Sequence, residues 1–146
     1  MNHLQRFYTA LKEFICRNRI GPQALLARFI LSKEHCKKGR VWPGAFEIKE
    51  DETEISVFRI DGLPGNVIWE IGKKYIIPLR PGRHIHGRAD LEAMSIMDLG
   101  LKIRPDNKPK RHALITNLPK EKYDRQEIAV RLAEASRLVL PYSTFK

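Results

Sequence analysis

The chain has 146 residues, of which 42% are apolar and 30% charged, and its formal net charge is +10. This composition fits one globular domain, is too apolar for intrinsic disorder, and contains no apolar run of the ~18 residues that a membrane span needs. The two cysteines, Cys16 and Cys36, exclude a secreted disulfide framework, so we expect a cytoplasmic protein with reduced thiols.

Apolar residues recur at helical spacing near the N-terminus and predict an amphipathic helix over residues 3–18. We assign residues 1–21 to this N-terminal helix and residues 22–146 to a single domain. The apolar run from Leu25 to Leu31 fits either a strand or a buried helical turn. Residues 55–60 are rich in β-branched side chains and predict a buried strand.

The second half of the chain alternates helices and strands. We predict a helix from about Pro64 to Ile77, a loop over 78–87, and a helix from an N-cap at Asp90 to Leu99. Two β-rich segments then flank a turn-rich connector and predict an antiparallel hairpin: residues 101–104 and 111–117. A final helix is expected to reach Leu140, with a core stripe of Ile128, Leu132, Ala135 and Val139. The predicted fold is α+β, with helices packed on a small, mostly antiparallel sheet.

Positive charge is concentrated at the two ends of the chain. Residues 1–50 and 100–146 each carry a net charge of +6, whereas residues 51–99 carry −2. This distribution predicts basic patches, which attract phosphates and other polyanions.

The densest group of functional side chains lies between residues 80 and 90, where three arginines and two histidines precede the predicted helix start. A helix N-terminus beside Arg83 and Arg88 would bind an anion through its N–H groups and guanidinium donors. The alternative is structural: Asp90 caps the helix and pairs with Arg88 or Arg83.

Three histidines suggest an enzymatic alternative. His84 or His86 could act with His112 as an acid and a base on a phosphodiester, because the histidine pKa lies near neutrality. The His84-x-His86 spacing also fits a metal pair, but further ligand clusters are missing, and we expect neither a metal nor a cofactor. The phosphate loops GxxxxGK[ST] and GxGxxG and the GxSxG motif are absent, which argues against nucleotide hydrolases and serine hydrolases.

Two further basic segments could follow a nucleic-acid backbone: Lys37, Lys38 and Arg40, beside Trp42 and Phe46, and the connector with Lys108, Lys110 and Arg111. Aromatic side chains next to cations could stack on bases, although Trp42 could equally anchor its loop.

Arg59 is a charged residue within a β-rich run. The segment Ser56-Val57-Phe58-Arg59 is similar to the strand that holds NAD in ADP-ribosyltransferase-like folds, but no later Ser-Thr or Glu motif of that family follows. The alternative is that Arg59 faces solvent or pairs with Asp61 or Glu70.

Several stretches resemble a family of small uncharacterised bacterial proteins over about residues 25–140. They are Arg28-Phe29-Ile30 with Ser32-Lys33, Ser56-Val57-Phe58-Arg59, Ile68-Trp69-Glu70-Ile71-Gly72, Gly87-Arg88-Ala89-Asp90 and Arg111-His112-Ala113. The resemblance implies a bacterial origin and supplies no catalytic residues.

These observations favour a basic module that binds the phosphates of RNA or DNA without strong sequence specificity. One alternative is an enzyme acting on a phosphate-containing substrate, either a phosphodiesterase or an NAD-using transferase. Another is a subunit of a bacterial complex that meets a protein partner through the N-terminal helix. No membrane contact is expected.

Overall fold

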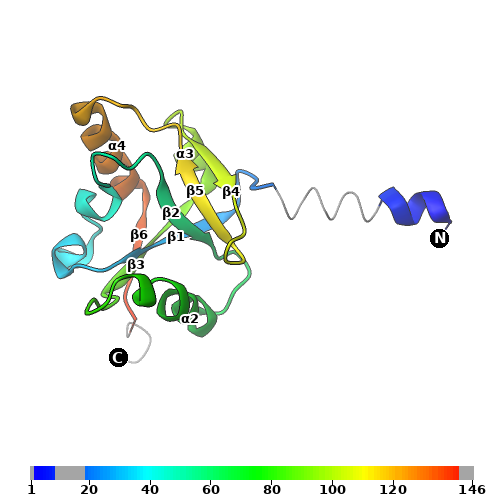
Figure 1. Cartoon of the computed structure of the whole chain (residues 1–146), viewed down its shortest axis with the longest axis horizontal. Coiled ribbons are helices and arrows are strands. Elements are labelled where there is room, and N and C mark those ends of the chain that lie inside the picture. Colours follow the sequence, from blue (N-terminus) through cyan, green and yellow to red (C-terminus); the bar gives the residue numbers. More distant parts are fainter. Residues whose placement is uncertain (1, 9–18, 142–146) are drawn as a thin grey trace.

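The chain folds around one antiparallel sheet of six strands, as Figure 1 shows. The computed structural model describes residues 2–8 and 19–141. The strands lie in the order β4-β5-β2-β1-β3-β6. Their bounds are β1 Leu25–Ile30, β2 Ile55–Arg59, β3 Gly87–Glu92, β4 Lys102–Pro105, β5 His112–Thr116 and β6 Arg137–Val139. The predicted α+β class is confirmed.

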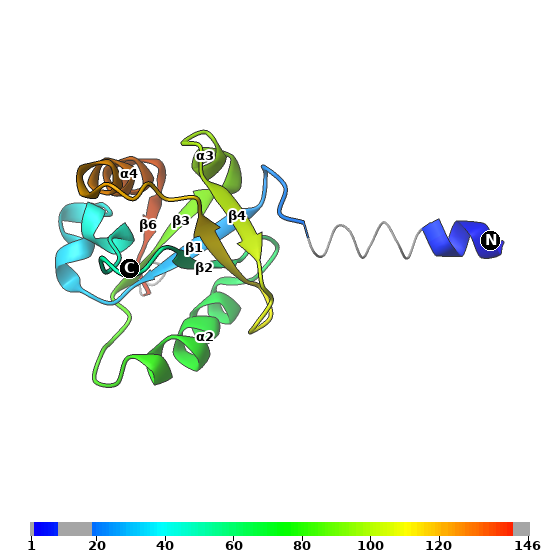
Figure 2. The ribbon, with the colours of Figure 1, turned by 45° about the horizontal axis from the view of Figure 1, so that its top comes forward.

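Helical elements cover both faces of the sheet (Figure 2). The α-helices are α2 Gly65–Tyr75, α3 Ala93–Met97 and α4 Lys122–Ala135, and the 3₁₀ turns are η1 Lys33–His35, η2 Lys37–Gly39, η3 Pro43–Phe46 and η4 Ile77–Leu79. Helix α4 and turn η3 pack in the larger apolar cluster on one face, and α2 packs in a smaller cluster on the other. Because both faces are buried, β1 is apolar on nearly every residue, and periodicity could not distinguish it from a helical turn.

Several predicted elements are confirmed. Helix α2 and strand β2 lie where the sequence placed them, and β4 and β5 form the predicted antiparallel pair, in which Ile103 faces Ile115. The helical prediction at residues 3–8 is also confirmed, whereas its continuation over 9–18 lies outside the described residues. Within the described parts of the chain, no helix is long and apolar enough to cross a membrane.

The predicted helix start at Asp90 is wrong. Asp90 lies inside β3, and the short helix α3 begins only at Ala93, with Glu92 at its N-cap position. Alternation explains the difference, because Ala89 and Leu91 point to the larger apolar cluster while Arg88 and Asp90 point to the opposite face. Six residues of β3 pair with β1, so tertiary pairing outweighs the local capping signal.

The predicted C-terminal helix is too long. Helix α4 ends at Ala135, and the chain then forms the edge strand β6, which pairs with β3. Ala135 is exposed and Val139 is part of β6, so neither belongs to a helical core stripe. The fully buried positions of α4 are Ala129, Leu132 and Ala133.

Strands β1 and β2 separate near the middle of the sheet. They pair only at Leu26 with Arg59 and at Ala27 with Phe58, whereas β1 and β3 pair along six residues. From Arg28 onward the two strands no longer share a ladder. This separation creates the cleft described next.

Candidate functional site

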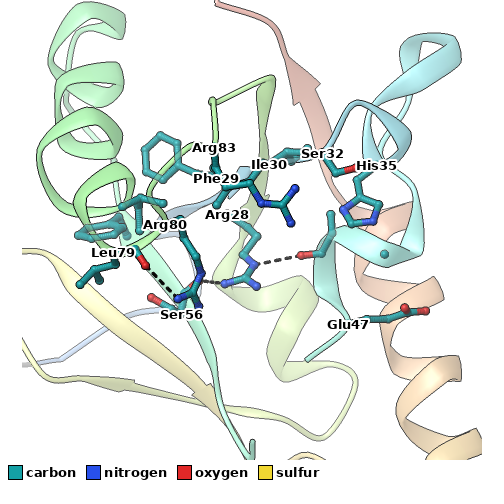
Figure 3. Close-up of a pocket in the computed structure, with 15 residues that line it drawn as sticks. Arg28, Phe29, Ile30, Ser32, His35, Glu47, Ser56, Leu79, Arg80 and Arg83 are labelled. Carbon is teal, nitrogen blue, oxygen red and sulfur yellow. Dashed lines mark hydrogen bonds between the residues drawn. The ribbon is translucent and has the colours of Figure 1, made fainter. Parts of the chain in front are cut away.

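A cleft of about 300 Å³ opens where β1 and β2 separate (Figure 3). Its walls come from the end of β1, the start of β2, turn η3 and the segment after α2. Three arginines line it, and Glu47 is the one acidic side chain among its described lining residues. The polar and charged lining residues are Arg28, Ser32, His35, Glu47, Ser56, Arg80 and Arg83.

Arg28 is half-buried at the separation of the two strands. Its Nε donates to the carbonyl of Ala45 at 3.0 Å, and its Nη1 donates to the carbonyl of Ser56 at 2.9 Å. The guanidinium therefore donates to a β2 carbonyl at a point where the β1 backbone no longer pairs with β2. Its Nη2 takes part in none of the hydrogen bonds among the described residues, so it remains a donor for a ligand in the cleft.

No carboxylate of the described residues is bonded to Arg28. Burial lowers its pKa to about 10, with Glu52 raising the pKa and Arg80 lowering it further. Arg28 is thus still a cation at neutral pH, held in a partly desolvated place beside another cation. An anion in the cleft would relieve both effects, because it favours the charged form.

Arg80 and Arg83 bring two more guanidinium groups to the cleft from the loop after η4. Both residues are exposed. The Arg80 Nη1 donates to the carbonyl of Leu79 at 3.2 Å, and the backbone N–H of Arg83 donates to the carbonyl of Arg80 at 3.1 Å, which turns the loop. Neither arginine is paired with a carboxylate among the described residues.

His35 forms the wall opposite the two loop arginines (Figure 3). It packs so closely on Gly44 that a Cβ at this glycine would lie 2.4 Å from the imidazole Nε2. Glycine at position 44 is therefore required for the present shape of the cleft.

The predicted anion ligand Arg88 lies elsewhere. It is 7% exposed, and its Nε bonds both carboxylate oxygens of Asp90, at 2.9 and 3.1 Å. Its guanidinium also lies over the ring of Trp69 at 4.6 Å, and its buried Nη1 is without a hydrogen-bond partner among the described residues. Burial raises the pKa of Asp90, although Arg88 opposes this shift. The structural alternative, an Arg88–Asp90 pair, is what the structure contains, on a strand and not at a helix start.

The three predicted histidines do not converge. His84 and His86 precede β3 near Arg83, whereas His112 begins β5, and strands β2 and β1 lie between them. The pKa of His86 is lowered from its ordinary value, first by desolvation and then by Lys33, His84 and Arg83. His86 thus lies among basic groups but is not among the described lining residues of the cleft, while His112 is hydrogen-bonded to Ser56 and Asp106.

The basic segment after β1 is exposed, but its aromatic residues are occupied. Lys37, Lys38 and Arg40 are on the surface. Arg40 covers the ring of Trp42 at 3.8 Å, and the Trp42 indole N–H donates to the carbonyl of Lys37. Phe46 is 2% exposed and belongs to the core, so the expectation that it stacks on bases is wrong.

The hairpin connector and Arg59 lie together at the other end of β2. Lys108 and Lys110 are exposed, and the carbonyl of Arg111 accepts from the backbone N–H of Arg59. The Arg59 side chain pairs with Asp61 at 2.9 Å, which is the structural alternative given for it. That pairing lowers the pKa of Asp61, although burial alone would raise it.

The predicted site did not include Arg28, Ser56 or Asp106, and Arg80 belonged to the 80–90 cluster without an assigned role. Arg28 and Ser56 each interrupt an apolar strand, and this interruption was the available signal. Comparison of the chain with protein-family models, with curated proteins and with solved structures finds no match. Within residues 2–8 and 19–141, no group of three or more His, Cys, Asp or Glu side chains is arranged to hold a metal ion.

Proposed function

We infer that the protein binds phosphate-bearing polyanions, namely RNA or DNA without strong sequence specificity, and that the cleft is its phosphate site. The observation that carries this inference is the grouping of Arg28, Arg80 and Arg83 around one cavity, where no carboxylate from residues 2–8 or 19–141 is bonded to them. Guanidinium groups bind phosphate through charge-assisted hydrogen bonds, which are the strong ones in proteins.

The surroundings of the cleft support a polymeric ligand over a small anion. Lys33 is exposed and follows the lining residue Ser32, and the exposed segment with Lys37, Lys38 and Arg40 comes next along the chain. A phosphodiester strand could place one phosphate in the cleft and its neighbours along this segment. Trp42, already covered by Arg40, adds little base recognition, which is consistent with binding independent of sequence.

The test is the affinity of the full chain for a short fluorescent single-stranded RNA, measured by fluorescence anisotropy between about 50 and 200 mM salt. We expect affinity to fall steeply with salt, and DNA of the same sequence to bind comparably, because the phosphates are shared. Absence of RNA and DNA binding at about 50 mM salt would disprove the proposal.

A matched pair of variants separates the cleft from general attraction by positive charge. Arg80→Ala with Arg83→Ala removes two charges from the cleft, whereas Lys108→Ala with Lys110→Ala removes two exposed charges from the connector at the other end of β2. We expect the first pair to weaken binding at least about tenfold and the second about two- to threefold. Equal losses from both pairs would show that the cleft is not the site.

A further inference from the structure

We propose that the cleft is also a catalytic centre, in which Ser56 is the nucleophile for hydrolysis of a phosphate ester and His112 is its base. Asp106 is the residue that positions His112. The substrate class rests on the proposed function, because it assumes that the cleft holds a phosphate group.

Three side chains form a continuous chain of hydrogen bonds. The Ser56 Oγ lies 2.5 Å from the His112 Nε2, and the His112 Nδ1 lies 2.7 Å from the Asp106 Oδ1. A neutral imidazole that donates its Nδ1–H to Asp106 presents Nε2 as an acceptor, so the Ser56 hydroxyl donates to His112. This is the arrangement that activates serine nucleophiles on unrelated folds, and it is recognised by geometry and not by chain order. The missing GxSxG motif therefore does not exclude it.

The turn between β4 and β5 fixes the base. Asp106 follows β4 directly, and its Oδ1 also accepts from the backbone N–H of Lys108 at 3.2 Å. Its own backbone N–H donates to the carbonyl of His112 at 3.2 Å. The His112 ring meets the ring of Phe58 edge-on at 5.1 Å, and its side chain is only 14% exposed. The imidazole is thus oriented on one side by a carboxylate and sheltered on the other by an aromatic ring.

Ser56 links this hydrogen-bonded chain to the cleft. Ser56 is a lining residue, and its own carbonyl accepts from the Arg28 Nη1 at 2.9 Å. Arg80 is close enough to Arg28 to lower its pKa (Figure 3). A phosphoryl group attacked by Ser56 would develop negative charge next to these guanidinium groups, which is where preformed donors stabilise a transition state.

The reaction balances without a metal or a second reagent other than water. The Ser56 Oγ attacks phosphorus as its proton passes to the His112 Nε2, an Oγ–P bond forms, and the bond from phosphorus to the leaving oxygen breaks. The leaving alcohol takes the proton from His112. Water then attacks the phosphoserine phosphorus, gives one proton to the His112 Nε2, and breaks the Oγ–P bond. That proton returns to the Ser56 oxygen.

The nucleophile is tested with a neutral fluorophosphonate, which reacts by the same attack on phosphorus and releases fluoride. The purified full chain is incubated with the reagent, and the adduct is located by intact mass and peptide mapping. We expect one adduct on Ser56, lost in Ser56→Ala and formed at least about 100-fold more slowly in His112→Gln. Ser32→Ala is the matched control, because Ser32 lines the same cleft but no His112-like partner bonds its hydroxyl among the described residues.

Two further readouts separate catalysis from bracing of the fold. Asp106→Asn should slow the labelling of Ser56, and Asp106→Glu should restore part of the rate. If the hydrogen bonds among Ser56, His112 and Asp106 only stabilise the fold, neither substitution should change the labelling rate. Bis(4-nitrophenyl) phosphate should be hydrolysed by the wild-type chain and not by Ser56→Ala, and Arg80→Ala should slow its hydrolysis.

Each outcome has a definite consequence. A folded wild-type chain that gives no adduct on Ser56 overturns this inference and leaves RNA binding untouched. An adduct on Ser56 in a chain that binds no RNA, DNA or inorganic phosphate overturns the proposed function, and the phosphate-ester substrate with it. An adduct together with phosphodiester hydrolysis, both lost in Ser56→Ala while RNA binding persists, supports both proposals.

Discussion

Arg28 and Arg88 lie on neighbouring central strands but have opposite environments. Arg88 points to the α2 face, where Asp90 neutralises its charge and Trp69 covers its guanidinium. Arg28 points to the other face, where its partners in the described part of the chain are the carbonyls of Ala45 and Ser56, and it lines a cleft with two more arginines. The positive charge of a buried arginine is neutralised when a carboxylate is bonded to it. An arginine that is hydrogen-bonded only to neutral carbonyls keeps its positive charge and can bind an anionic ligand.

The largest expected effect on stability comes from breaking the Arg88–Asp90 ion pair. Arg88→Ala should lower the free energy of unfolding by about 3–5 kcal/mol, because it leaves the Asp90 carboxylate buried without its partner. Urea unfolding measures the change. The double variant with Asp90→Ala should recover part of the loss, since the unpaired charge is then gone as well. A loss below about 1 kcal/mol in the single variant would mean that Asp90 is solvated after all.

Arg28→Met should have a small effect on stability and a large effect on RNA binding. Two hydrogen bonds to carbonyls are lost, but a partly desolvated charge is removed too, so we expect the free energy of unfolding to fall by only about 1–2 kcal/mol. RNA affinity should fall about tenfold or more, because the central donor of the cleft is gone. The same unfolding and anisotropy measurements apply. If Arg28→Met is as unstable as Arg88→Ala and still binds RNA normally, Arg28 is a structural residue and not a ligand-binding one.

These two arginines also show the limits of sequence reasoning. The charged cluster before Arg88 and Asp90 predicts a helix start, but the same two residues alternate with Ala89 and Leu91 and fit a strand. The Arg88–Asp90 pair is local, whereas the partners of Arg28 are the carbonyls of Ala45 and Ser56, which come from other elements and are not revealed by spacing along the chain. The hairpin, α2 and β2 were predictable because their turn and periodicity signals are local.

The cleft itself could not be predicted for a related reason. It exists because β1 and β2 pair only at Leu26 with Arg59 and at Ala27 with Phe58. Arg28 and Ser56 mark this region as polar, but they do not by themselves reveal that the two strands separate there. Ser56 and Asp106 are fifty positions apart and meet only through His112, which reaches across from β5. The exclusion of a serine nucleophile relied on a motif from one fold, while the hydrogen-bond geometry does not depend on that motif.

A smaller effect concerns the pH dependence of His86, which lies among the basic groups of Lys33, His84 and Arg83. The folded pKa of His86 lies below its ordinary value, so the unfolded chain takes up a proton before the folded one does, and stability should fall as the pH drops below about 6.5. A bound phosphodiester offsets the repulsion from Lys33, His84 and Arg83. We therefore expect affinity for an oligouridylate to rise about two- to threefold between pH 7.5 and pH 6.

His86→Gln provides the control, because it keeps a polar side chain of similar size without a titrating group. The pH dependence of binding should flatten in this variant, as followed by anisotropy at constant ionic strength. An unchanged pH profile would assign the effect to His35 or His84 and not to His86.

The most direct measurement follows the two arginines during titration with a short RNA. The Nε–H groups of Arg28 and Arg88 are both hydrogen-bonded, to the Ala45 carbonyl and to the Asp90 carboxylate, and are suitable for ¹H–¹⁵N NMR after assignment with Arg28→Met. The account predicts that the Arg28 signal shifts and saturates with RNA while the Arg88 signal stays in place. A shift of the Arg88 signal with an unmoved Arg28 signal would contradict it.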